Sequence, residues 1–501
     1  MNKRIQKSQK RNKQTHKVVE KLYKPPRVLV TPEAKDNPFA MEILQRAKDY
    51  NPNLEVIFTK NQMPKLPDGL TDHEKFAYLK DSPMLCTRSK TASYIETFAS
   101  PGNIVENMGA MAKIAFHCPM KCQFCYLNIS GRSTPWTRMY VSLDRLKGEM
   151  VKERLVHKIA LTIWTILSYS KGISISKVPP KFKDLIDKRV RKDVLSPRKS
   201  ISTDVDALKY LEKNLESFLN FLGIKFSQNI PQKVRELLSG YWEENSKLPL
   251  WINIGEYTDI LCIDHITGYM DQILQWIEED PELRIQFRTT GTYIDNLLKH
   301  NGHGRVRITF NLNTDFAINK YEHGPAMLDE KFEAIKKLLA HGGYDIRIAI
   351  EPIIKYDGYE KDYAELIRRI KNEIGLDKVT NIKIGTIRFK TVLKNYIIRL
   401  FPDSGLFDDM SLYNAPEPGD KRWRYTDDER VAIYKMLIDE IGNQDNISIG
   451  LGSEQPRIWD KVGLDTKMPH AGIVHQFTKA EPGKPLKAHK RKKNVQKKLN
   501  K

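Results

Sequence analysis

The stretch HCPMKCQFCY, residues 117–126, decides how the rest of this chain is interpreted. It holds three of the five cysteines, Cys118, Cys122 and Cys125, in the spacing C-x3-C-x2-C. A short apolar run precedes it and predicts a strand, while Pro119 prevents a helix at the first cysteine. We therefore expect the three thiols on a loop that follows a strand.

The spacing of the cysteines favours an iron–sulfur cluster over zinc. A structural zinc ion takes four ligands, and only Cys86 or Cys262 could add a thiolate, without a second C-x2-C pair. His117 adjoins Cys118, and adjacent residues rarely reach one tetrahedral ion. A [4Fe-4S] cube held by three cysteines keeps one iron open. The stretch resembles the signature of radical S-adenosylmethionine (SAM) enzymes, in which SAM binds that iron and yields a 5'-deoxyadenosyl radical; structural zinc is the alternative.

Length and composition indicate a globular protein with two or three domains. The chain has 501 residues, of which 40% are hydrophobic. It contains no run of eighteen apolar residues, so the sequence predicts no membrane-spanning helix. The basic N-terminus lacks the apolar stretch of a secretory signal. Three clustered cysteines among five do not make a disulfide framework. We expect a reducing, cytoplasmic environment and no membrane partner.

The charge of the chain is strongly basic and concentrated near its ends. Lys and Arg number 83 against 62 Asp and Glu, a net charge of +21. Residues 1–24 carry nine Lys or Arg and residues 479–501 carry ten. Such arms favour a polyanion partner, nucleic acid first, since each neutralised phosphate releases counterions. Solvated, disordered tails are the alternative.

From residue 111 onward, predicted strands and helices alternate, which is typical of a parallel β/α architecture. The predicted strands span 113–117, 250–254, 284–289, 305–313, 345–351, 381–388 and 447–451. The predicted helices span 142–168, 263–279, 327–341, 360–374 and 427–442. Earlier in the chain, strands at 27–30 and 54–58 flank a helix at 40–50, and a short strand begins at 84. The strands are rich in Ile and Val, as burial on both faces requires.

We predict an α/β fold, a partial (β/α)6 radical SAM barrel with a small N-terminal β-α-β unit and an α-helical insertion. A basic linker over 177–199 divides the insertion's helical patterns. The predicted divisions are a basic disordered arm over 1–24, an N-terminal α/β domain over 25–110, the barrel over 111–149 and 248–460, the insertion over 150–247 and a basic C-terminal tail over 461–501. Because parallel strands end at one edge, that edge is expected to carry the chemistry.

Polar residues follow three of the barrel strands. Gly255 and Glu256 come directly after the strand at 250–254, and a carboxylate there can hold an ammonium group. Thr290 and Asn311 end the next two strands and can hydrogen-bond to hydroxyl or carboxylate groups. Helix capping and strand termination are the alternatives for all of them.

Beyond the superfamily signature, the chain resembles the spore photoproduct lyase family. The stretches that carry this resemblance are 118–128, 139–144, 257–259, 263–267, 313–315, 321–324, 351–354, 385–389 and 453–459. The resemblance implies a [4Fe-4S] cluster bound by Cys118, Cys122 and Cys125, and SAM as cosubstrate. In the family's founding activity, the radical abstracts hydrogen from a thymine dimer photoproduct in DNA, and a protein cysteine later returns a hydrogen atom.

The resemblance also implies roles for other residues and exposes two departures. Thr258, Thr290 and Asn311 fall where the lyase places SAM ligands, although Thr290 replaces a lysine. Glu256 stands where the lyase has its hydrogen-donor cysteine, and a carboxylate cannot donate a hydrogen atom as a thiol does. Tyr126 is kept, so Glu256 and Tyr126 are the candidate catalytic pair. Phe124 replaces a second tyrosine of the lyase, and Cys262 is the alternative donor.

The sequence thus predicts a radical SAM enzyme acting on nucleic acid, with DNA repair as its expected role and lyase-type carbon–carbon chemistry. A flavodoxin or ferredoxin would supply electrons. Two alternatives stay open at this point. One is radical SAM modification of a base, a peptide or a small molecule, and the other is a non-enzymatic, metal-containing nucleic-acid-binding protein.

Overall fold

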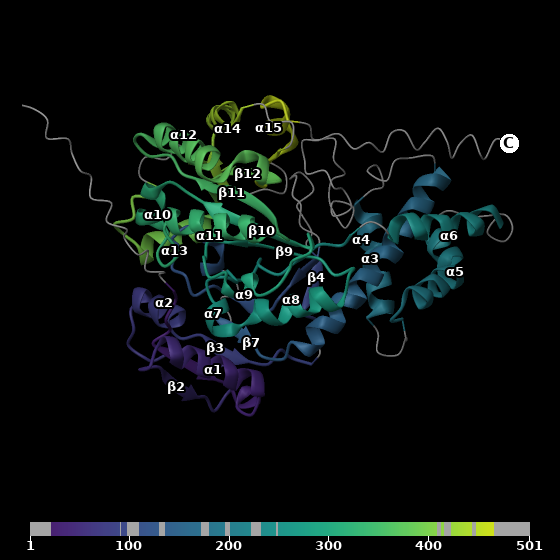
Figure 1. Ribbon diagram of the computed structural model, residues 1–501, viewed down its shortest axis with the longest axis horizontal. Helices are drawn as coiled ribbons and strands as arrows, with labels where there is room; N and C mark the ends of the chain where they lie inside the picture. Colours follow the sequence, from purple (N-terminus) through teal and green to yellow (C-terminus); the bar gives the residue numbers. More distant parts are fainter. Residues whose placement is uncertain are drawn as a thin grey trace, which may run out of the picture.

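The structure is a computed structural model that describes most of the chain between residues 22 and 464. The described ranges are 22–90, 92–97, 110–129, 136–171, 180–195, 201–221, 232–246, 249–407, 412–414, 422–442 and 447–464. The predicted basic arms lie outside these ranges, apart from residues 22–24 and 461–464. Two sheets and their covering helices form one body, and a group of helices projects from its side (Figure 1).

The larger sheet has the strand order β16-β12-β11-β10-β9-β8-β5-β4. Its strands are β4 (Ile95–Thr97), β5 (Ala110–Ala112), β8 (Ile252–Asn253), β9 (Ile285–Thr289), β10 (Val306–Leu312), β11 (Asp345–Ile353), β12 (Asn381–Thr386) and β16 (Ser448–Leu451). From β5 to β16 all pairs are parallel, and only the edge strand β4 is antiparallel. The carboxyl ends of these strands therefore meet at one edge, as the sequence predicts.

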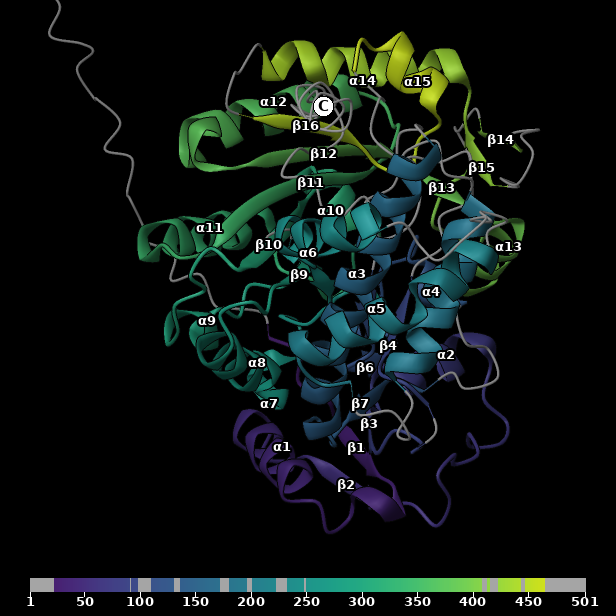
Figure 2. The same ribbon diagram turned by 90° about the vertical axis from the view of Figure 1, so that its right-hand side faces the viewer.

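Helices follow the strands and cover the sheet (Figure 2). They are α7 (Asp264–Thr267), α8 (Tyr269–Glu279), α9 (Asp295–Leu298), α10 (Asp315–Tyr321), α11 (Leu328–His341), α12 (Tyr359–Arg369), α13 (Thr391–Leu400), α14 (Asp427–Ile441) and α15 (Pro456–Lys461), with a π-helical turn at Ile370–Ile374 and a 3-10 turn at Leu376–Lys378. The single helix expected over 263–279 is divided, because Gly268 adopts a left-handed backbone (φ 64°) between α7 and α8.

The smaller sheet has the order β2-β1-β3-β7-β6. Its strands are β1 (Arg27–Val30), β2 (Glu55–Phe58), β3 (Met84–Cys86), β6 (Ala115–Phe116) and β7 (Arg138–Tyr140), accompanied by α1 (Pro38–Tyr50), α2 (Asp72–Lys80) and a 3-10 turn at Pro32–Ala34. Of the strand expected over 113–117, only Ala115–Phe116 (β6) is a strand, and it joins the smaller sheet, whereas β5, just before it, joins the larger sheet. One apolar core spans both sheets, and the division at 110/111 stays a prediction.

Four helices make up the projecting group: α3 (Asp144–Lys171), α4 (Pro180–Val194), α5 (Asp204–Phe221) and α6 (Gln232–Ser246). They enclose an apolar core of their own, in which Trp164 and Phe218 are fully buried. The linker expected over 177–199 is wrong for most of its length, since α4 begins at Pro180, a residue favoured in the first turn of a helix. Buried Lys158 ties the group to the main body through Glu282, 3.3 Å away.

A third, antiparallel sheet lies near the end of the chain, with β15 (Trp423–Tyr425) between β13 (Arg388–Phe389) and β14 (Leu412–Asn414). None of the helices in the described ranges is long and apolar enough to cross a bilayer.

Candidate functional site: the cysteine loop and the carboxyl edge of the large sheet

The cysteine loop begins where β6 ends and is held in place by backbone hydrogen bonds. His117 adopts a left-handed backbone (φ 67°), which turns the chain out of the strand. The backbone amide of Lys121 then donates to the carbonyl of His323, 2.8 Å away, and that of Gln123 donates to the carbonyl of Tyr321, 2.9 Å away. A short 3-10 turn, Tyr126–Asn128, ends the loop. The loop after a strand that the sequence predicts is therefore present.

The three thiols of the loop share one largely buried environment. Cys118 is buried, Cys122 and Cys125 are half-buried, and all three pack in a small apolar cluster with Met120 and Cys262. Burial, followed by the nearby Asp259 carboxylate, raises the pKa of Cys118 to about 12, and burial also raises the pKa of the other two thiols. These thiols would lose their protons only to a bound cation, which is how iron and zinc bind cysteine.

The donor set of the loop fits an iron–sulfur cluster. Three thiols on one loop, anchored by backbone hydrogen bonds and packed in one cluster, are the ligand type that such clusters use.

Tyr126 and Glu256 meet at this site, although 130 residues separate them. The Tyr126 hydroxyl donates to the backbone carbonyl of Glu256 at 2.6 Å and contacts its carboxylate oxygen Oε1 at 2.8 Å. Nearly half of the Tyr126 surface is exposed. Desolvation and then the Glu256 carboxylate hold the pKa of the Tyr126 phenol well above its usual value, so the phenol keeps its proton.

Two other predicted residues present buried oxygen atoms that have no hydrogen-bond partner in the structure. They are the hydroxyl oxygen of Thr258, which follows β8, and the amide oxygen of Asn311 in β10. Both residues are more than 90% buried. Orphaned buried polar atoms are costly, and a ligand with donor groups would satisfy them. SAM carries an ammonium group and ribose hydroxyls, so these positions fit it.

Gly255 packs closely against the neighbouring strand, and its predicted part in cofactor binding stays a prediction. A Cβ atom added there would lie 2.8 Å from the Cβ of Phe287 and 3.2 Å from the backbone of Arg288 in β9. The close approach that a strand-end glycine permits is therefore made to the neighbouring strand of the same sheet.

Thr290 is hydrogen-bonded to the carboxylate of Asp259, which ends the stretch 257–259 of the family resemblance. Its amide and hydroxyl donate to Asp259 Oδ2 at 2.6 and 2.7 Å, and Thr289 donates to Asp259 Oδ1 at 2.6 Å. The Thr290 hydroxyl also lies 3.8 Å from the sulfur of Cys262. Cys262, the alternative hydrogen donor, precedes α7 and is buried in the apolar cluster of the cysteine loop.

A buried carboxylate lies among the ends of the sheet strands. Glu351 in β11 forms ion pairs with Arg388 Nη1, 2.6 Å away, and with Arg288 Nη1, 2.7 Å away. Burial alone would raise the pKa of Glu351, but the two guanidinium groups outweigh it and hold the pKa well below its ordinary value. The sequence alone assigns no role to Glu351, because its two partners come from two other strands, β9 and β13.

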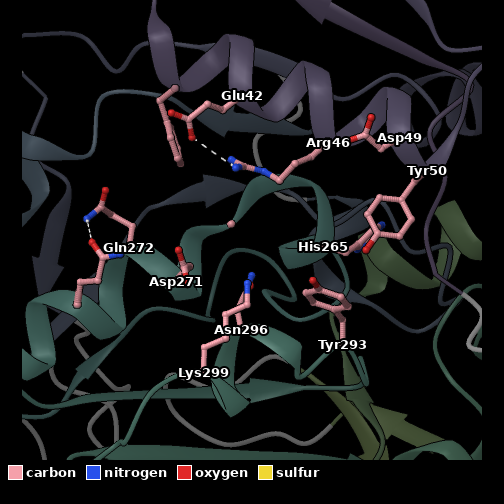
Figure 3. A pocket seen from close by; sticks show the side chains of 13 residues that line it. Glu42, Arg46, Asp49, Tyr50, His265, Asp271, Gln272, Tyr293, Asn296 and Lys299 are labelled. Carbon is pink, nitrogen blue, oxygen red and sulfur yellow. Dashed lines mark hydrogen bonds and ion pairs between the residues drawn. The ribbon is translucent and has the colours of Figure 1, made fainter.

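The cavity shown in Figure 3 lies away from the cysteine loop. It has a volume of about 550 Å³ and is lined by α1 and by α7 to α9 with their connections. His265 lines it and donates through Nε2 to the carbonyl of Tyr23, 2.6 Å away. Arg46, which also lines the cavity, donates hydrogen bonds to the carbonyls of Ile266 and Thr267.

Three comparisons with known proteins agree with one another. Residues 239–447 match a family model described as spore photoproduct lyase. Spore photoproduct lyase of Clostridium acetobutylicum is 21% identical over 419 residues, which are 83% of this chain and 94% of that protein. The enzyme of a Geobacillus species is 28% identical over 184 residues, which are 36% of this chain and 54% of that protein.

Solved structures give the same fold. A substituted spore photoproduct lyase with dinucleoside spore photoproduct has a TM-score of 0.57 and 18% identity, and the match covers 85% of this chain and 99% of that one. Another, with bound AdoMet and dinucleoside spore photoproduct, has a TM-score of 0.56 and 18% identity, covering 86% and 99%. The predicted radical SAM fold class is thereby confirmed.

The fold and the comparisons together define an enzyme of the radical SAM lyase type. The non-enzymatic alternative is thereby set aside. Within that class, the chain is most simply described as similar to spore photoproduct lyases, in agreement with the resemblance seen in its sequence.

Proposed function

We propose that this protein is a radical SAM enzyme that abstracts hydrogen from a nucleic-acid substrate, with damaged DNA as the expected form. The observation that carries the proposal is the buried set of three thiols on one anchored loop. Cys118, Cys122 and Cys125 would hold a [4Fe-4S] cluster with one iron left for SAM. When bound, the cluster and SAM supply the electron and the carbon-centred radical that abstracts hydrogen.

The remaining roles are assigned to residues of the same edge. Thr258 and Asn311 would hydrogen-bond to SAM through their orphaned oxygen atoms. Thr290 would serve SAM only as an acceptor, because its hydroxyl proton is directed to Asp259. Gly255 would shape the turn that leads to Thr258.

Tyr126 is proposed to return hydrogen to the substrate, and Glu256 to position it. The phenol is protonated and held by Glu256, so its O–H hydrogen has a fixed place. In the transfer, the O–H bond of Tyr126 breaks homolytically, the hydrogen atom bonds to a carbon radical of the substrate, and a tyrosyl radical remains. This arrangement replaces the thiol donor that the family resemblance leads one to expect at position 256.

A nucleic-acid substrate is supported by the relatives and by the charge of the chain. Structures similar to this one contain dinucleoside spore photoproduct. The net charge of +21 is concentrated near the two ends, which suits a polyanion. An electron donor such as a flavodoxin or ferredoxin completes the proposed system.

The test is anaerobic reconstitution with iron, sulfide, SAM and dithionite. We expect about four iron atoms per chain, the number that one cube holds, a SAM-dependent change in the cluster spectrum, and 5'-deoxyadenosine. A colourless, zinc-only protein that forms no 5'-deoxyadenosine would refute the proposal.

Glu256 also favours a second candidate, in which the same radical chemistry modifies a base, a peptide or a small molecule. Without a thiol at position 256, the classic lesion reversal lacks its expected donor. Parallel assays with irradiated DNA and untreated DNA, both containing deuterated thymine, distinguish the two candidates. Deuterium in 5'-deoxyadenosine with irradiated DNA alone supports repair.

A further inference from the structure

Lys80, the last residue of α2, is a buried cation beside the cysteine loop. Only 4% of its surface is exposed, and its ammonium group donates to the carbonyl of Cys118, 2.6 Å away. Within the described residues no carboxylate lies within ion-pair distance of that ammonium group; the adjacent Asp81 pairs instead with Lys121 at 2.9 Å. Burying an ammonium group destabilises the fold by roughly several kcal/mol unless an opposite charge compensates it.

The groups positioned to compensate Lys80 are the three thiols. The ammonium group lies 2.6 Å from the carbonyl of Cys118, and Cys118 packs with Cys122 and Cys125 in one cluster. As neutral thiols they cannot compensate its charge. As cluster ligands they are thiolates in an anionic centre, which gains one further negative charge when it is reduced.

A second buried lysine near the loop provides a contrast. Lys331 has no exposed side-chain surface, and its charge favours the ionised form of Cys122. It pairs, however, with the equally buried Glu322 at 3.3 Å. Its charge is therefore cancelled locally. The charge of Lys80 has no such carboxylate and is left to act on the loop.

Lys80 is also held rigidly. The hydroxyl of Tyr23 donates to the Lys80 carbonyl at 2.7 Å, and the carbonyl of Tyr23 accepts from His265 in the cavity wall of Figure 3. At its other end, α2 begins with a capping box between Thr71 and Glu74. A fixed charge loses little of its effect to rearrangement, unlike a mobile surface lysine.

We infer that Lys80 is the fixed counter-charge of the iron–sulfur cluster and raises its reduction potential. The inference rests on the proposed function, because it needs a cluster on Cys118, Cys122 and Cys125. A cation at this place stabilises the more negative, reduced state more than the oxidised state. It thereby eases the one-electron reduction that must precede SAM cleavage. Lys80 is a positioning residue in this scheme and does not touch the substrate.

The test compares Lys80→Gln, which keeps a donor for the Cys118 carbonyl but removes the charge, with Lys80→Arg, which keeps the charge. Lys75→Gln, on the same helix, is the matched control. Each full-length protein is reconstituted anaerobically, its iron is measured, and its midpoint potential is determined by redox titration followed by electron paramagnetic resonance. We expect normal iron and a more negative midpoint for Lys80→Gln, and midpoints near that of the parent for the other two.

The outcomes are distinguishable. An unchanged midpoint in Lys80→Gln overturns the inference, as does an equal shift in Lys80→Arg, which would assign the effect to geometry. Iron bound by Lys80→Arg but not by Lys80→Gln supports a counter-charge needed even for assembly. Loss of iron in both variants shows a role in folding the loop and overturns the inference. Failure of the parent protein to bind iron refutes the proposed function instead.

Discussion

The Tyr126 hydroxyl and the Glu256 carboxylate oxygen Oε1 are 2.8 Å apart, which joins the end of the cysteine loop to the end of β8. If Tyr126 returns hydrogen to the substrate, Tyr126→Phe should still form 5'-deoxyadenosine but accumulate little final product. Glu256→Gln keeps a neutral acceptor and loses a charge-assisted hydrogen bond of about 1.5 kcal/mol, so the return step should slow by about tenfold. Product and 5'-deoxyadenosine are quantified in the same reaction by mass spectrometry.

Cys262→Ala is the companion variant for that experiment, because Cys262 is the alternative donor and is buried beside Cys118. It should leave the ratio of product to 5'-deoxyadenosine unchanged. The reverse pattern, with Tyr126→Phe normal and Cys262→Ala impaired, would transfer the donor role to Cys262.

The three cysteines of the loop should be individually necessary for iron binding. Cys118→Ala, Cys122→Ala and Cys125→Ala should each reconstitute with little iron and lack the absorbance of a cube, because no other thiol lies on the loop. Cys86→Ala is the control. Burial raises the pKa of Cys86 to about 12, and the residue lies in β3 within the main apolar core. Loss of iron in Cys86→Ala, or its retention in a loop variant, contradicts the assignment.

Glu351 should make the protein sensitive to acid. Its pKa in the folded state is lower than the ordinary value of 4.5, so unfolding takes up a proton at pH values between the two. The stabilisation is therefore complete above about pH 4.5 and is lost as the pH falls toward the folded-state pKa. Glu351→Gln leaves two guanidinium groups without their carboxylate partner and should lower the free energy of unfolding by about 3 kcal/mol at pH 7.

Denaturant unfolding from pH 3 to pH 7 measures this effect. Glu351→Gln should show a flatter dependence on pH than the parent protein. Glu333→Gln, at an exposed pair with Lys336 on α11, is the control and should change the free energy of unfolding by at most about 0.5 kcal/mol. Parallel pH curves for Glu351→Gln and the parent would show that the two arginines do not lower the pKa of Glu351.

Local patterns sufficed for the parts of the fold that depend on local burial. The strands β9, β10 and β11 follow from apolar residues at alternate positions, and α14 follows from its apolar period and its capping box at Thr426. Helix α2 was overlooked, although Thr71 and Glu74 form a capping box, because its apolar face is short. The division of residues 110–116 between two sheets depends on strand pairing, which no local pattern encodes.

The same limit applies to the candidate site. The three cysteines are apparent from spacing, and Glu256 and Tyr126 from the family resemblance. The roles of Lys80, Asp259 and Glu351 are not, because each residue acquires its meaning from partners on other elements. A buried charge is conspicuous only once the fold shows what surrounds it.

The basic arms should govern DNA binding but not SAM cleavage. Removing residues 1–21 and 479–501 takes away eight and ten basic side chains, and it spares Tyr23, which contacts Lys80 and His265. The truncated protein should bind DNA more weakly, and the logarithm of its affinity should fall less steeply with the logarithm of salt concentration. Fluorescence anisotropy at several salt concentrations measures both. An unchanged slope would show that the arms do not contact phosphates.

Replacing each of two glycines with alanine should change the stability of the protein in opposite directions. At Gly452, a Cβ atom would lie 2.4 Å from the Oε1 atom of Glu351, a side chain that two arginines hold in place, so Gly452→Ala should cost about 1–3 kcal/mol through overpacking. Gly148 lies exposed in α3 with nothing within 4 Å of such an atom, so Gly148→Ala should stabilise the protein by about 0.5–1 kcal/mol. Chemical denaturation of both variants measures the two changes in the free energy of unfolding. A neutral Gly452→Ala would mean that Glu351 moves freely, which would also undermine the acid sensitivity expected from its ion pairs.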